Sequence, residues 1–176
     1  MDIYQIFITH NRIWSKLQLL IFCLIMLTIM LISAWLLHSG KIKKTQAMAI
    51  ILFVAFLWIV LASTVFTREI EPRQYSLIPF GSWRQVFIYH DVELIQEIFL
   101  NCILLLPAGC LLPLMRGRTI RLKSAFAVGG GISAVIEVSQ LIFRRGVFEC
   151  DDMIHNALGC MLGCVIVNIC IRWIKN

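Results

Sequence analysis

The sequence predicts an all-α fold, a polytopic bundle of about five transmembrane helices. Of its 176 residues, 60% are hydrophobic and 15% are charged, and the mean hydropathy is +0.85, far from the composition of a soluble globular domain. A bilayer core about 30 Å thick needs about 20 apolar residues per helix, and about five stretches satisfy this length. Because these stretches use the whole length, we expect residues 1–176 to form a single membrane domain.

The first two spans are simple apolar helices. Residues 17–37 contain no charged side chain and precede a basic cluster that begins at Lys41, and residues 47–66 are also free of charge. The first stretch is longer than the apolar core of a signal peptide, and no small-residue cleavage site follows it. We therefore expect it to be retained as a span.

The third span, residues 92–115, is expected to be kinked. It contains Pro107 and Pro113, and proline removes a backbone donor and clashes with the preceding turn of a helix. Membrane bundles tolerate such breaks where a neighbour satisfies the freed carbonyl groups. The last two spans are expected at residues 122–143 and 152–173.

Five spans place two polar connections on the same face of the membrane. These are residues 67–91, between the second and third spans, and residues 144–151, between the fourth and fifth. The first is rich in turn formers and aromatic residues, which is typical of an interfacial or re-entrant segment. We expect it to form an interfacial loop over a polar pocket.

Glu137 is the most informative residue of this pocket. At 1.5 Å per residue, its backbone lies roughly 10 Å below Arg144, a depth at which an unpaired carboxylate is costly and usually faces the bundle interior. Arg144 is one candidate partner. Other polar residues near this face recur at spacings of three or four, which align side chains on one side of a helix. The expected ligand-binding residues are Arg68, Arg73, Glu97, Asn101, Glu137, Gln140, Arg144, Arg145, Asp151, Asp152 and Asn156.

Structural explanations of the same residues remain open. Amides and small residues often serve only to pack transmembrane helices, and the pair Gly159 and Gly163 is a weak signal by itself. Asp151 and Asp152 also suit the N-terminus of the fifth span, where acidic groups complement the helix macrodipole.

Asn101, Pro107, Gly109 and Pro113 in the third span precede Glu137 and Gln140 in the fourth, and Asp152, Asn156, Gly159 and Gly163 follow in the fifth. This order of motifs resembles the VanZ-like family of bacterial membrane proteins. In that family a helix with the pattern N-x5-P-x-G-x3-P precedes a helix with E-x-x-Q. An arginine and aspartates follow, and then D-x3-N-x2-G-x3-G. An upstream LIPF motif at residues 77–80 also matches, although Ser76 stands where the family usually has asparagine. The resemblance covers residues 68–165, and this chain supplies Asn101, Pro107, Gly109, Pro113, Glu137, Gln140, Arg144 or Arg145, Asp151, Asp152, Asn156, Gly159 and Gly163 in that order.

The resemblance implies a role in the bacterial cell envelope, because the founding member of that family is associated with low-level resistance to the glycopeptide teicoplanin. The expected function is to confer or modulate resistance to lipophilic glycopeptides through a polar outer-leaflet pocket that binds a lipid or amphiphile. The expected partners are membrane lipids, with a lipid-linked cell-wall precursor or a lipoglycopeptide as further candidates.

An alternative is an intramembrane enzyme that modifies a lipid or a lipid-linked envelope precursor. Arginines would then clamp a phosphate bidentately, and Glu137, Asp151 or His155 would act as general acid or base. The sequence offers no obvious nucleophile with a paired base, and neither a cofactor nor a metal is expected. Whether a reaction occurs, and the oligomeric state, stay open.

The basic charge indicates lipid rather than nucleic acid. The net charge is +6 and the pI about 9.1, but the basic residues flank apolar spans instead of forming one stripe. Nine of the 16 Lys and Arg residues lie on the side of Lys41 and Arg116, and seven lie on the other side. The positive-inside rule therefore favours an outside N-terminus and a cytoplasmic C-terminus in the bacterial cell membrane.

Overall fold

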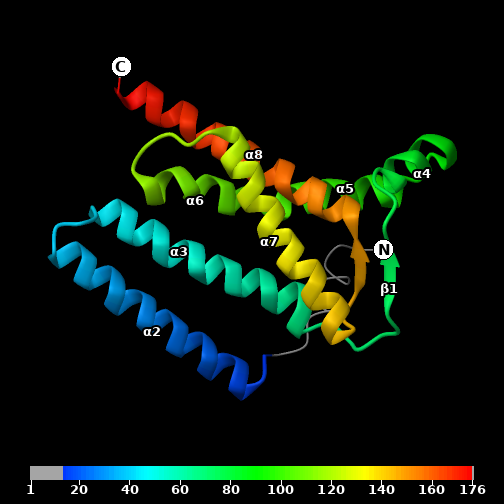
Figure 1. Cartoon of the computed structure of the whole chain (residues 1–176), viewed down its shortest axis with the longest axis horizontal. Coiled ribbons are helices and arrows are strands. Elements are labelled where there is room, and N and C mark those ends of the chain that lie inside the picture. Colours follow the sequence, from blue (N-terminus) through cyan, green and yellow to red (C-terminus); the bar gives the residue numbers. More distant parts are fainter. Residues whose placement is uncertain (1–13, 176) are drawn as a thin grey trace.

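The computed structural model describes residues 14–175, and this part of the chain is mostly helical (Figure 1). Five of its segments are long and apolar enough to cross a membrane, which confirms the predicted fold class. The largest difference from the predicted limits is at the start of the second span, which begins at residue 44 rather than 47. The five segments are Lys16–His38, Lys44–Phe66, Val92–Arg116, Leu122–Phe143 and Cys150–Ile174.

Helix α2 (Lys16–His38) begins with a capping box and packs against α3 (Lys44–Leu61) at one edge of the bundle (Figure 1). The hydroxyl of Ser15 accepts a hydrogen bond from the Gln18 backbone at 3.2 Å, and the Gln18 side chain accepts one from the Ser15 backbone at 2.8 Å. Helix α3 continues as a short π-helix, η1 (Ala62–Phe66). Such π-turns are rare and are often found at functional sites.

The third span is broken into α5 (Val92–Leu104) and α6 (Leu106–Arg116). The interruption falls at Leu105, whose φ of −100° and ψ of 7° leave the helical region. Proline is tolerated in the first turn of a helix, because a backbone N–H there would have no partner within the helix. Pro107 lies in the first turn of α6. The break therefore lies just before the first of the two prolines.

Helix α8 (Cys150–Lys175) packs against α5, α6 and α7 (Leu122–Phe143). Its glycines allow this close approach. A Cβ atom at Gly159 would collide with the carbonyl oxygen of Cys102, and one at Gly163 would collide with that of Leu106. Small residues of this kind let transmembrane helices meet backbone to backbone.

The two polar connections meet at one end of the bundle (Figure 1). Strand β1 (Gln74–Ser76) and strand β2 (Val147–Glu149) form a parallel pair, in which Tyr75 lies opposite Phe148. The short helix α4 (Gly81–Tyr89) follows β1. At the other end, the Gln46 side chain donates to the Met115 carbonyl at 3.0 Å, and the turns 39–43 and 117–121 lie there with the C-terminal end of α8 (Figure 1).

Candidate functional site

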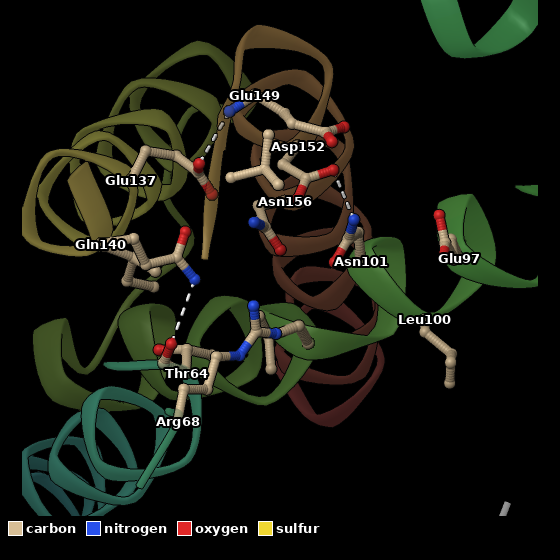
Figure 2. A pocket seen from close by; sticks show the side chains of 13 residues that line it. Thr64, Arg68, Glu97, Leu100, Asn101, Glu137, Gln140, Glu149, Asp152 and Asn156 are labelled. Atoms are coloured by element: carbon tan, nitrogen blue, oxygen red, sulfur yellow. Dashed lines mark hydrogen bonds between the residues drawn. The ribbon is translucent and has the colours of Figure 1, made fainter. Parts of the chain in front are cut away.

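A cavity of about 370 Å³ lies among η1, α5, α7, β2 and α8, at the end of the bundle where the polar connections meet. Figure 2 shows side chains from these elements pointing toward one another across it. Part of its wall is apolar and is formed by Leu100, Leu104, Ile136 and Val147. The polar part of its wall consists of Thr64, Arg68, Glu97, Asn101, Glu137, Gln140, Glu149, Asp152 and Asn156.

Glu137 projects from α7 and is only 2% exposed. One of its carboxyl oxygens, Oε2, accepts a hydrogen bond from the backbone N–H of Glu149 at 2.9 Å (Figure 2). Because β2 pairs with β1, the backbone that holds Glu137 is itself fixed by the connection between the second and third spans. A buried carboxyl group requires such a partner.

Asp152 and Asn156 project from successive turns of α8. The side-chain amide of Asn101, on α5, donates to Oδ1 of Asp152. The amide of Asn156 donates to the hydroxyl of Ser133, on α7, at 2.8 Å. These two contacts join α8 to the helices on either side of the cavity.

Gln140 and Arg68 close the site on the side of η1. The Gln140 amide donates to the Thr64 carbonyl at 3.1 Å (Figure 2). Gly146 has a φ of +132°, and a Cβ atom there would lie 2.9 Å from a guanidinium nitrogen of Arg68. Glycine at this position therefore permits both the backbone conformation and the placement of the arginine.

Three arginines of the expected set do not line the cavity. Arg145 donates to the backbone carbonyls of Phe66 at 2.7 Å and Arg68 at 2.6 Å. Arg144 has a left-handed backbone, and its side chain approaches the Glu71 carbonyl at 3.5 Å. Arg73 is exposed on the connection that leads to β1. These contacts of Arg144 and Arg145 organise the polar connections.

Asp151 and His155 hold α4 and do not line the cavity. The carboxylate of Asp151 accepts hydrogen bonds from the backbone N–H groups of Phe80 and Ser82, the second at 2.8 Å, at the N-terminus of α4. One turn later, Nε2 of His155 accepts a hydrogen bond from the indole of Trp83 at 2.9 Å. Both side chains are buried, at 4% and 2% exposure.

A family model described as VanZ/LLP1 matches residues 18–171. The chain belongs to the VanZ/LLP1 family. The match spans nearly the whole chain and includes the first two spans, beyond the region that the motifs cover. Comparison with curated proteins and with solved structures finds no match.

Two polar residues that line the cavity, Glu149 and Thr64, are not in the expected set. Glu149 lies between Arg145 and Asp151 in the same polar connection, and this position in the sequence could have indicated that it belongs to the site. Thr64 gave none, because it lies within an apolar span and only the π-helix turns its carbonyl toward Gln140. Burial raises the pKa of Glu149 above the ordinary glutamate value, and the nearby Glu97 and Asp151 raise it further.

The arrangement is rich in oxygen acceptors. Within residues 14–175, no three His, Cys, Asp or Glu side chains are grouped closely enough to hold a metal ion. What the cavity offers is a set of fixed carboxyl and amide groups beside an apolar wall. That combination suits recognition of a molecule with one polar and one apolar part.

Proposed function

We propose that this protein acts in the bacterial cell membrane as an envelope factor that binds the polar head of a lipid or another amphiphile. Binding would take place in the cavity, facing the outer leaflet, and would confer or modulate resistance to lipophilic glycopeptides of the teicoplanin type. The observation that carries the proposal is Glu137, a buried carboxyl group that is hydrogen-bonded at the wall of a cavity among apolar spans. Intramembrane ionisable groups are costly, and they usually mark sites of function.

Exposed apolar side chains on the helix that lines the cavity support the binding of an amphiphile. Leu100 lines it and is 50% exposed, and Phe99 and Ile103 on the same helix are also exposed. In a membrane these side chains face lipid tails. A head group bound among the carboxyl and amide groups could therefore leave its tail in the surrounding hydrocarbon.

A position at the outer leaflet would place the cavity where lipid-linked cell-wall precursors and lipophilic glycopeptides occur. Binding one of them, or a lipid beside them, would lower access of the antibiotic to its target. A drug with a lipid tail, such as teicoplanin, would then be affected more strongly than vancomycin.

The enzyme alternative receives less support from the contacts. Only Arg68 of the four expected arginines lines the cavity, so a clamp built from several arginines is not assembled there. Asp151 and His155 are engaged with α4, which leaves Glu137 as the one expected acid or base at the cavity wall.

The test is susceptibility to teicoplanin beside vancomycin in a Gram-positive host that expresses the parent chain or Glu137→Gln at matched membrane levels. The parent should protect, more strongly against teicoplanin, and Glu137→Gln should return susceptibility to that of the empty vector. Glu93→Gln is the matched control, because this exposed acid at the start of α5 lies outside the cavity. It should protect as the parent does.

Two results would contradict the proposal. Equal protection by the parent and by a normally inserted Glu137→Gln variant would remove the cavity from the function. Absence of protection by the parent chain would contradict the glycopeptide role itself.

A further inference from the structure

Each amide side chain of the cavity already uses one of its donors within the protein. The NH₂ group of Asn101 donates to Asp152, that of Gln140 donates to the Thr64 carbonyl, and that of Asn156 donates to Ser133. An amide carries donors only on its nitrogen and acceptors only on its oxygen. What each of these three residues has left for a ligand is therefore its oxygen and one N–H.

One of these oxygens is buried without a partner. Asn156 is 2% exposed, it lines the cavity, and its Oδ1 accepts no hydrogen bond from any described residue. Figure 2 shows this side chain between Glu137 and Asp152 on one side and Arg68 on the other. A buried acceptor without a donor costs free energy, so a ligand that brings a donor would remove this cost.

The charged groups of the wall point the same way. Four carboxyl groups line the cavity, against the single guanidinium of Arg68, and they belong to Glu97, Glu137, Glu149 and Asp152. Ionised carboxylates gathered around one space repel one another, and a nearby positive charge relieves that repulsion. An anionic head such as a phosphate would increase it.

We infer that the cavity binds the protonated amine of an amphiphile, with its N–H groups directed at the carboxyl oxygens and at Oδ1 of Asn156. This inference rests on the proposed function, that the cavity receives the head of an amphiphile, and it names the chemical class of that head. An alkylammonium group carries three donors and no acceptor, which complements a wall with four carboxyl groups and the free Oδ1 of Asn156. Its hydrocarbon chain would lie along the apolar wall at Leu100 and Leu104.

The lining also distinguishes an amine from a quaternary ammonium. Quaternary heads have no N–H and are typically bound in cages of aromatic side chains. None of the described lining residues is aromatic. A choline-type head would satisfy the charge of this cavity and leave its hydrogen-bond acceptors without donors.

The experiment measures which amphiphile stays bound to the full-length protein in nanodiscs of neutral lipid, by native mass spectrometry. The probes share one hydrocarbon chain and differ only in the head: octadecylammonium, octadecyltrimethylammonium, octadecanoate and octadecanol, each at the same small mole fraction. Octadecylammonium should be retained at least about tenfold better than each of the others, because charge-assisted hydrogen bonds supply the difference.

Variants locate the binding. Glu137→Gln and Asp152→Asn should each reduce retention of octadecylammonium by about tenfold, since each removes a carboxyl group that can pair with the ammonium. Glu93→Gln should leave it unchanged. Arg68→Gln should increase it, because this change removes the one positive charge among the described lining residues.

The outcomes separate this inference from the proposed function. Preferential retention of octadecanoate or octadecanol that is lost in Asp152→Asn would overturn the amine and leave amphiphile binding standing. Equal retention of octadecyltrimethylammonium and octadecylammonium would overturn the role of the N–H donors. If the parent protein retained none of the four probes, both the inference and the proposed binding function would fail. The comparison of probes on the parent protein does not depend on how the variants fold.

Discussion

Glu137 and Glu149 constrain each other although both are acids. The backbone N–H of Glu149 donates to the Glu137 carboxyl at 2.9 Å, and the Glu149 side chain lines the same cavity. The burial of Glu149, with Glu97 and Asp151 nearby, raises its pKa. Glu149 therefore supplies a backbone donor to Glu137 and also places its own acidic side chain close to other acids.

The raised pKa gives stability a definite dependence on pH. Because the pKa of Glu149 is higher in the folded than in the unfolded protein, its stabilising contribution is complete below the unfolded value, about 4.3, and is lost as pH rises through the folded value. Glu149→Gln should therefore raise Tm at neutral and alkaline pH, by no more than about 2 °C because water screens this partly exposed group. Thermal unfolding in detergent over a range of pH checks this, and a Tm difference that is the same at every pH would contradict it.

At the scale of elements, α4 depends on a cap supplied by another helix. Asp151, at the start of α8, accepts hydrogen bonds from the Phe80 and Ser82 backbones. Phe80 itself has a left-handed backbone with φ of 60° and offers no side-chain cap. The first turn of α4 thus relies on a carboxylate about 70 residues away in the sequence.

Asp151→Ala should therefore release α4 without unfolding the bundle. Loss of an N-cap costs about 0.5–2 kcal/mol, so backbone amides of Gly81–Tyr89 should exchange with solvent deuterium about two- to thirtyfold faster. Hydrogen exchange with mass spectrometry measures this. Asp91→Ala is the matched control, because Asp91 caps α5 through Glu93 and Leu94, and it should leave exchange in α4 unchanged. Unaltered exchange of α4 in Asp151→Ala would contradict this account of the cap.

The contact of α8 with the broken third span permits no added methyl group. At Gly159 a Cβ atom would meet the Cys102 backbone, whereas at Gly131, in α7, it would meet no atom within 4 Å. Gly159→Ala should destabilise the protein by about 2 kcal/mol or more through overpacking. Gly131→Ala should be neutral or should stabilise it by up to about 1 kcal/mol, because alanine favours a helix over glycine. Chemical unfolding in mixed micelles compares the two, and similar values would show that the backbones are not in contact.

Which elements the sequence could predict depended on their length. Five spans follow from runs of about 20 apolar residues, and the break in the third span follows from its prolines. The pair of strands could not be predicted, because three residues such as Gln74–Ser76 are too few to show an alternating pattern. The π-helix likewise leaves no mark in the uncharged stretch that contains Thr64.

At the scale of the whole molecule, the two spans that separate the polar connections were enough to bring both connections to one end. It did not determine which side chains would meet there. Successive residues of a helix point about 100° apart, so the neighbours Asp151 and Asp152 diverge, one toward α4 and the other toward Asn101. The packing of α8 decides which of these two acids lines the cavity. Arg145 likewise contacts a backbone carbonyl, that of Phe66, and does not line the cavity.

The proposed function requires the cavity to face outward, so the direction of the bundle in the membrane tests it. The charge asymmetry of the loops favours a cytoplasmic C-terminus. Green fluorescent protein fused after residue 176 should then fluoresce, and alkaline phosphatase at the same position should stay inactive. A protease site inserted after the exposed Tyr89, at the end of α4, should be cleaved from outside intact cells. The opposite pattern would put the cavity on the cytoplasmic side, where it could not receive an outer-leaflet amphiphile, and the glycopeptide role would lose its structural basis.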